Sequence, residues 1–199
     1  MVRPVRHSED EILAIAREVF IERGPSVSLA VIAARLGLSQ PALSQRFGSK
    51  RALLLRALAP TQELDRLLEL SEGPDARPFD VQLHALARAA LELLEEAIPT
   101  MMTLRLAGPE VLAGTAGELE LPHEQVRVAL VGYFARAQQR ELVRALAPAQ
   151  VTAMFIGSLQ AIALQAYVSG EPVDPAAREA AIEGLVDLFM WGVAKRAQP

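Results

Sequence analysis

The 199-residue sequence predicts an all-α protein of about nine helices, with a small N-terminal three-helix domain and a larger C-terminal helical domain. The composition is 51% hydrophobic but only 5% aromatic. Alanine and leucine dominate it, and both residues favour helix because they lose little side-chain freedom there. Apolar residues recur at helical spacing, and no run of alternating β-branched residues indicates a strand. We expect the domains to comprise residues 1–50 and 51–199.

The first predicted helix follows a short basic arm formed by residues 1–7. Ser8 is its predicted N-cap, and Glu11 three residues later completes a capping box. The helix extends to Gly24, with a buried stripe predicted from the apolar spacing. That stripe comprises Ile12, Ile15, Ala16, Val19 and Phe20. His7, just before the helix, is expected to be a solvated arm residue.

Residues 27–46 are typical of two short helices joined by a tight turn. Ser28 and Ser39 are predicted N-caps, and Pro41 lies just inside the second helix, where its missing N–H costs nothing. Gly37 can adopt the left-handed conformation that the turn requires. The apolar side chains that should face one another across the turn are Ile32, Ala33, Leu36, Leu43 and Phe47. This arrangement is a helix-turn-helix.

A close crossing of these two helices is also predicted. Ala33 and Gly37 are four residues apart and therefore share one side of the first helix. Bulky side chains there would push the helices apart, so we expect the second helix to cross at these two small residues. The alternative is that residues 27–50 are simply three packed helices of an all-α protein.

The outer face of the second helix is rich in hydrogen-bond donors and has no acidic residue. Gln can pair with adenine, Arg with guanine or phosphate, and Ala with a thymine methyl, so this face suits the major groove of DNA. We expect Gln40, Gln45 and Arg46 to read bases or to orient the helix on them. The full candidate DNA-binding set is Ser28, Ser39, Gln40, Pro41, Ala42, Ser44, Gln45, Arg46 and Lys50.

This helix-turn-helix resembles that of the tetracycline-repressor (TetR) family of transcriptional regulators. The motifs that carry the resemblance lie at residues 32–33, 35–39, 43–47 and 49–53, and a weaker match covers residues 134–142. We expect phosphate contacts from Ser28, Ser44 and Lys50, and Lys50 stands where the family has a phosphate-directed Lys. Ser44 stands where the family usually has a phosphate-contacting Tyr, and Arg46 stands where it usually has His.

The charge distribution agrees with a DNA-binding N-terminus. The net charge is −4, but residues 1–58 carry nine Lys or Arg and five acids, or +4, which leaves −8 for the remainder. Only charges within about 8 to 10 Å of DNA act strongly on it, so an acidic C-terminal domain does not prevent binding.

The C-terminal part is predicted to be helical between clear breaks. A helix over residues 50–70 should be kinked or split by Pro60, and residues 71–78 should form a loop. Further helices are expected at about residues 79–97, 100–113, 122–144, 148–169 and 175–196. The breaks between them are predicted at Pro99, at residues 114–117, at Pro148 and at residues 170–172.

The last two helices are unusually apolar, and we expect them to pair with their copies in a homodimer. Residues 151–168 contain no charge but several polar residues, which favours a protein interior or dimer seam over a membrane span. Small residues recur every four positions in the last helix, which would allow close helix packing. The expected interface comprises Leu159, Ala163, Ala180, Gly184, Leu188 and Gly192. The alternative is that both helices only close the monomer core.

A small, largely apolar effector is expected to bind the C-terminal domain. The candidate lining residues are Met101, Met102, Arg105, Tyr133, Phe134, Met154, Phe155 and Gln160. The alternative is that most of them are ordinary core residues.

Catalytic and metal chemistry find little support in the sequence. Cysteine is absent, and the three histidines are too scattered for a local metal motif. We therefore expect no catalytic residue, metal or cofactor. The N-terminus lacks the apolar segment of a signal peptide, so we expect a cytoplasmic protein without membrane association.

The resulting hypothesis is a ligand-responsive transcriptional regulator, most simply a repressor. It would bind a palindromic double-stranded operator as a homodimer, with half-sites about 34 to 36 Å apart or a multiple of that distance. Its effector would release it from the operator. The alternatives are a binding protein with the same fold but no operator, and a helical enzyme.

Overall fold

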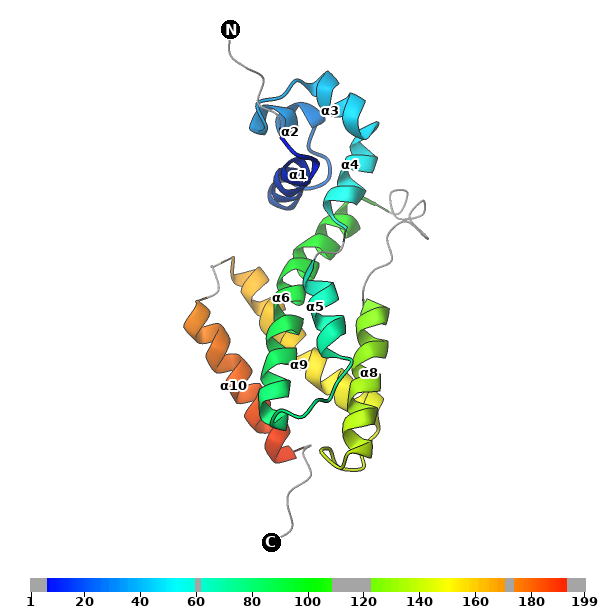
Figure 1. Cartoon of the computed structure of the whole chain (residues 1–199). Coiled ribbons are helices and arrows are strands. Elements are labelled where there is room, and N and C mark those ends of the chain that lie inside the picture. Colours follow the sequence, from blue (N-terminus) through cyan, green and yellow to red (C-terminus); the bar gives the residue numbers. More distant parts are fainter. Residues whose placement is uncertain (1–6, 60–61, 109–122, 171–173, 193–199) are drawn as a thin grey trace. The chain divides into compact units, whose positions relative to one another are not determined.

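The computed structural model describes residues 7–59, 62–108, 123–170 and 174–192. Within these ranges the chain forms nine α-helices and no β-strand (Figure 1), which confirms the predicted all-α class. The helices are α1 (Glu9–Arg23), α2 (Leu29–Arg35), α3 (Gln40–Phe47), α4 (Lys50–Ala57), α5 (Gln62–Leu70), α6 (Phe79–Leu106), α8 (His123–Gln139), α9 (Pro148–Ser169) and α10 (Pro175–Gly192).

The described residues divide into two compact units. The first, here called the head, comprises residues 7–59 and 99–108; the second, the body, comprises residues 62–98, 123–170 and 174–192. The head includes α4 and the last turns of α6, which the predicted domain of residues 1–50 leaves out. Leu104 of α6 is 2% exposed within the head core, and Arg17 of α1 donates to the Thr100 hydroxyl at 3.0 Å.

The helix α1 begins with the predicted capping box. The Glu11 amide donates to Ser8 Oγ at 3.1 Å, and the Ser8 amide donates to Glu11 Oε2 at 2.8 Å. The predicted stripe is buried except at Ile15, which is only half-buried against the head core. The capping box therefore fixes where α1 starts, and the stripe fixes which face packs inward.

The helix-turn-helix forms as predicted, with two corrections. Ser39 accepts from the Ala42 amide at 3.3 Å, and Gly37 takes a φ of +64° at the turn. Ser28 occupies the N-cap position of α2, but its hydroxyl makes no capping hydrogen bond; its backbone oxygen accepts from Val31 instead. A Cβ at Gly37 would meet nothing within 4 Å, so the expected close crossing there is wrong. Gly37 is required by the backbone conformation of the turn.

Two predicted breaks differ in their outcome. The expected helix over residues 50–70 is split into α4 and α5, and Pro60 itself lies outside the described residues. The expected break at Pro99 is wrong, because α6 continues through it to Leu106. Proline removes one helical donor, and the neighbouring Thr100 and Leu104 are buried at 6% and 2% exposure. Burial on both turns after Pro99 outweighs that local cost.

Helix α8 ends earlier than predicted, at Gln139. Glu141 adopts a left-handed φ of 59°, and the amides of Glu141 and Leu142 donate to the oxygens of Gln138 and Ala137, both at 2.9 Å. This is a Schellman closure with Glu in the place that usually holds Gly. The helix predicted over residues 148–169 is confirmed as α9. Residues 109–113, the break at 114–117 and residues 193–196 lie outside the described residues.

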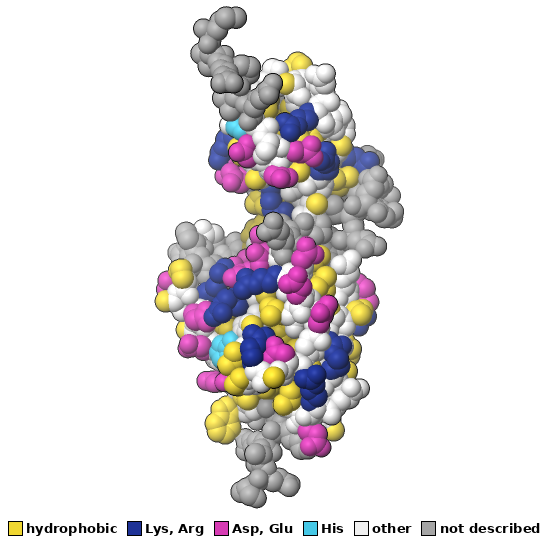
Figure 2. Space-filling model, viewed as in Figure 1, with side chains coloured by type: hydrophobic (Ala, Val, Ile, Leu, Met, Phe, Trp, Pro, Cys, Tyr) yellow, Lys and Arg dark blue, Asp and Glu magenta, His cyan; other side chains and the backbone are white. Residues whose placement is uncertain are grey.

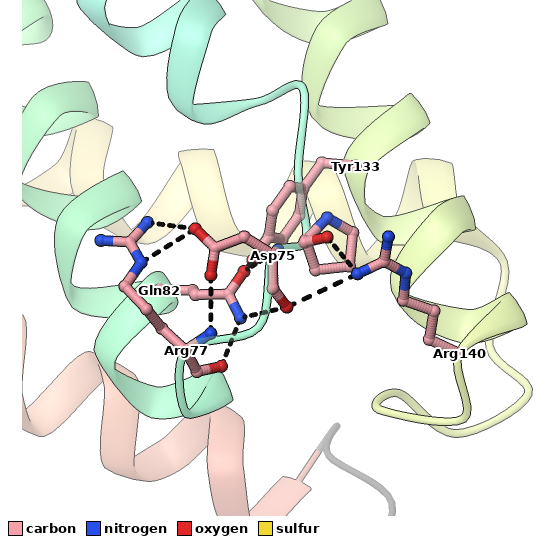
Figure 3. Close-up of polar contacts among 6 residues, drawn as sticks. Asp75, Arg77, Gln82, Tyr133 and Arg140 are labelled. Atoms are coloured by element: carbon pink, nitrogen blue, oxygen red, sulfur yellow. Dashed lines mark hydrogen bonds and ion pairs between the residues drawn. The ribbon is translucent and has the colours of Figure 1, made fainter.

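The loop at residues 71–78 is present as predicted, between α5 and α6. Figure 3 shows the buried Gln82 amide at its centre: it accepts from the Asp75 amide at 2.9 Å and from the Tyr133 hydroxyl at 3.2 Å, and it donates to the Arg77 oxygen at 2.7 Å. Arg140, the residue after α8, donates to the Pro74 oxygen. Burial raises the pKa of the Tyr133 phenol. Side chains therefore hold this loop against α6 and α8.

The body core contains an aromatic cluster contributed by α8, α9 and α10. Phe134 packs edge-on against Tyr133 and Phe155, with ring centroids 5.5 and 5.7 Å apart, and Phe155 packs against Phe189 at 5.1 Å. Such edge-to-face pairs stabilise a core beyond the area they bury.

Two residues of the predicted dimer interface also belong to this core. Leu159 and Ala163 are 0% and 2% exposed within a single chain, so their assignment to an exposed seam is wrong. The apolar residues of α9 cover both the inner and the outer face of the helix, so the sequence alone did not show which of them are buried within one chain. Among the described helices, α9 alone is long and apolar enough to cross a membrane. Length and composition of a single helix are weak evidence for a membrane span.

Candidate nucleic-acid interface

Helix α3 presents the predicted donor-rich face to solvent. Leu43 and Phe47 are buried in the head core, at 1% and 6% exposure. Between them, Ser44 is half-buried, whereas the rest of the set on α3 is exposed: Gln40, Pro41, Ala42, Gln45 and Arg46. Because α3 is anchored by two buried side chains and the Ser39 cap, its exposed side chains project from a fixed frame.

Arg46 is oriented by a residue that sequence reasoning left in solvent. Its guanidinium donates to the His7 backbone oxygen at 3.0 Å. The His7 ring lies 2.8 Å from the Leu36 oxygen at the turn and 3.6 Å from the Glu11 carboxylate. His7 therefore connects the start of α1 to both helices of the helix-turn-helix. The capping hydrogen bond from the Ser8 amide lowers the pKa of Glu11.

Lys50 is oriented in a similar way. Its ammonium donates to the Ser26 backbone oxygen at 3.3 Å, in the loop before α2. Lys50 is half-buried, so its stem packs on the head while its charge lies near the loop. Ser28, which is also predicted to contact phosphate, is exposed at the end of the same loop, at the N-cap of α2.

The partners of these cations decide whether their charge is available to phosphate. A carbonyl oxygen orients a cation without neutralising it, so Arg46 and Lys50 keep a full positive charge. Arg35 differs, because it lies 3.7 Å from both Glu18 and Glu22. Arg56 is likewise paired, with Glu9. Arg46 and Lys50 therefore differ from Arg35 and Arg56, because the acceptors of their hydrogen bonds are main-chain oxygens and not carboxylates.

The sequence contains a charge pattern around these cations that residue-by-residue analysis missed. Between Glu22 and Glu63 there are six basic residues and no acidic one. The stretch spans the whole helix-turn-helix and α4. On the face drawn in Figure 2, by contrast, basic and acidic side chains lie side by side both on the head and on the body.

The predicted effector-lining residues differ in burial and belong to both units of the chain. Tyr133, Phe134 and Phe155 fill the body core with one another's rings and leave that space occupied. The remaining candidates are exposed: Met101, Met102, Arg105, Met154 and Gln160. The assignment of the eight residues to an effector site stays a prediction. Among the described residues, no group of three or more His, Asp or Glu could hold a metal ion.

The head defines the chain as a helix-turn-helix DNA-binding regulator. Residues 12–57 match the family model for bacterial regulatory proteins of the tetR family. The resemblance to the TetR family, predicted from the motifs around the turn, is therefore confirmed over these residues. No curated protein matches the chain.

Solved structures show that the similarity extends over nearly the whole chain. A TetR transcriptional regulator from Streptomyces coelicolor is 26% identical, with 96% of this chain and 100% of that chain covered and a TM-score of 0.58. The TetR-family regulator PfmR from Thermus thermophilus is 24% identical, with 92% and 98% covered and a TM-score of 0.68. A transcriptional regulator from Saccharomonospora viridis, solved in complex with choline, is 19% identical, with 93% and 96% covered and a TM-score of 0.70.

Proposed function

We propose that this protein is a ligand-responsive repressor that binds a palindromic operator as a homodimer. The observation that carries the proposal is the pair of cations beside α3, Arg46 and Lys50, each oriented by a main-chain oxygen rather than a carboxylate. Contacts between such cations and the DNA phosphates supply much of the affinity of a protein for DNA. The exposed face of α3 fits the major groove.

Dimerisation through α9 and α10 is supported by apolar surface that a single chain leaves uncovered. Val168 of α9 is 75% exposed, and Leu188 and Trp191 of α10 are 72% and 71% exposed. A Cβ at Gly184 or Gly192 would meet nothing within 4 Å. Ala180 and Gly184 are exposed on the same row as Leu188. An exposed surface of large apolar side chains beside small residues with free space around them would allow α9 and α10 of a second subunit to pack closely against it.

Two observations support an effector site in the body. The Thr152 hydroxyl is buried in the body without a hydrogen-bond partner. A bound polar molecule could satisfy such a group, whose burial is otherwise unfavourable. The Saccharomonospora viridis neighbour binds choline, which is a small organic ligand. Release then requires that the effector bind the DNA-free form more tightly.

Operator binding is tested by measuring affinity for the protein's own upstream DNA across a salt series. We expect affinity to fall steeply with salt. In R46A/K50A both the affinity and the logarithmic salt slope should be lower, the slope by about 3.6, because a dimer loses two phosphate contacts in each subunit. R66A/R127A is the matched control, because it removes two charges from exposed ion pairs of the body. The same slope in R46A/K50A and the parent would refute the proposal. Binding insensitive to salt would favour a protein without an operator.

A further inference from the structure

We propose that Gln45 is the specificity-determining residue of α3 and reads an adenine–thymine pair, whereas Arg46 is a positioning residue that reads no base. The inference rests on the proposed DNA-binding function. It assigns different roles to two neighbouring residues that the sequence pattern treats alike.

The position of Gln45 follows from the two buried residues of α3. Successive helical residues are about 100° apart, and Gln45 is two positions from Leu43 and two from Phe47. It therefore lies about 200° from each and points directly away from the head core. Leu43 and Phe47 are 1% and 6% exposed, whereas Gln45 is exposed. In a helix that packs against the head through these two residues, Gln45 is the side chain that enters a groove first.

Ala42 lies beside Gln45 on the same exposed surface. Residues three apart are neighbours on a helix, with Cβ atoms about 5 to 6 Å apart. A glutamine amide can donate to adenine N7 and accept from adenine N6, and an alanine methyl packs on the thymine methyl. Ala42 and Gln45 together therefore favour an adenine–thymine pair or step. The capping role of Ser39 and the proline at position 41 place their exposed neighbour Gln40 in the first turn, away from this centre.

Arg46 is held at the side of this surface. Its guanidinium donates to the His7 oxygen, and the His7 ring is itself within hydrogen-bond distance of the Leu36 oxygen. Turning Arg46 into the groove would break this contact with the main-chain oxygen of His7. A guanidinium at the flank of the helix meets the phosphate backbone, where it fixes register but carries no sequence information.

The experiment begins with selection of the parent protein's half-site from randomised duplexes. Fluorescence anisotropy then measures affinities for that site, for a guanine–cytosine replacement, for 7-deazaadenine in place of adenine and for uracil in place of thymine. We expect a penalty of about 5- to 150-fold for the base-pair replacement. The two modified bases should each weaken binding, because they remove N7 and the methyl group. In Q45A the penalty for 7-deazaadenine should fall to near 1, and the penalty for base-pair replacement should fall to that for uracil, because Ala42 still contacts the thymine methyl.

Two variants serve as controls on the same helix. R46A should weaken binding to every duplex by a similar factor and leave their ranking unchanged. Q40A, which removes another exposed amide of α3, should leave the adenine preference in place. The assignment is overturned if Q45A keeps the parent's ranking, or if R46A relaxes preference at one base pair. If the parent selects no site at all, the proposed function fails instead.

Discussion

Arg46, at the end of the recognition helix, donates a 3.0 Å hydrogen bond to the main-chain oxygen of His7, 39 residues earlier in the chain. The His7 ring in turn lies 2.8 Å from the Leu36 oxygen, at the turn between α2 and α3. A substitution at position 7 keeps the main-chain acceptor but removes the ring that fixes its place. The geometry of Arg46 therefore depends on a side chain outside the helix-turn-helix.

The first prediction follows from this dependence. H7A should weaken operator binding by about 2- to 10-fold, the range expected for the net worth of one hydrogen bond. H7Q should recover part of the loss, because its amide can donate to the Leu36 oxygen. Operator affinity by fluorescence anisotropy checks both, with circular dichroism to show that the head stays folded. Equal affinity of H7A and the parent would mean that Arg46 positions itself without His7.

A second prediction concerns pH and the capping box of α1. Hydrogen bonding from the Ser8 amide lowers the pKa of Glu11 from its usual value of 4.5. A depressed folded-state pKa means that the stabilisation is present above pH 4.5 and is lost as pH falls through the folded-state value. We expect E11Q, which keeps an acceptor but cannot titrate, to lose less stability than the parent below pH 4.5. Thermal melts at pH 7 and pH 3.5 would show it; parallel losses would contradict it.

The turn glycine gives a third prediction. Gly37 has a φ of +64°, and a Cβ there would meet nothing within 4 Å, so the cost of a side chain is conformational and not steric. G37A should lower the free energy of unfolding by about 1 to 2 kcal/mol. G37N should cost less, since Asn tolerates left-handed backbone. Chemical denaturation measures the free energies of unfolding of the parent, G37A and G37N. A G37A protein as stable as the parent would show that the turn can adopt another conformation.

Sequence reasoning succeeded where the determinants lie within a few residues of one another. The Ser39 cap, the left-handed Gly37 and the capping box at Ser8 each depend on neighbouring backbone amides, and each formed as predicted. The continuation of α6 through Pro99 was missed, because it depends on tertiary burial that local proline chemistry does not report.

The candidate site shows the same division. Which residues of α3 face solvent follows from the helical spacing of Leu43 and Phe47, so the exposed set was predictable. The role of His7 was not, because its partners Leu36 and Arg46 are 29 and 39 residues away. Similarly, helical periodicity could not tell the buried Leu159 from the exposed Val168, since both lie in one apolar run of α9.

The fourth prediction tests the loop contacts drawn in Figure 3. Y133F removes one hydroxyl but leaves Gln82 accepting from the Asp75 amide, so it should cost about 0.5 to 1.5 kcal/mol. Q82L should cost more, because it leaves the buried Tyr133 hydroxyl without its acceptor, at about 1 to 3 kcal/mol, and also removes the acceptor of the Asp75 amide. Urea unfolding gives both values. A Q82L protein as stable as Y133F would show that the loop finds other partners.

The last prediction tests the proposed α9–α10 dimer at a position where a single chain has room for a larger side chain. A Cβ at Gly184 meets nothing within 4 Å, so G184R should fold normally as a monomer. In a symmetric interface the substitution occurs twice, and overpacking of about 1 to 3 kcal/mol at each site would raise the dimer dissociation constant by about 30- to 10⁴-fold. Sedimentation velocity over a concentration series measures the shift.

V128R is the matched control, because Val128 is 57% exposed on α8, outside the proposed seam. If G184R and V128R sediment alike as dimers, the twofold contact lies elsewhere, and the spacing of the two recognition helices must be set by other helices.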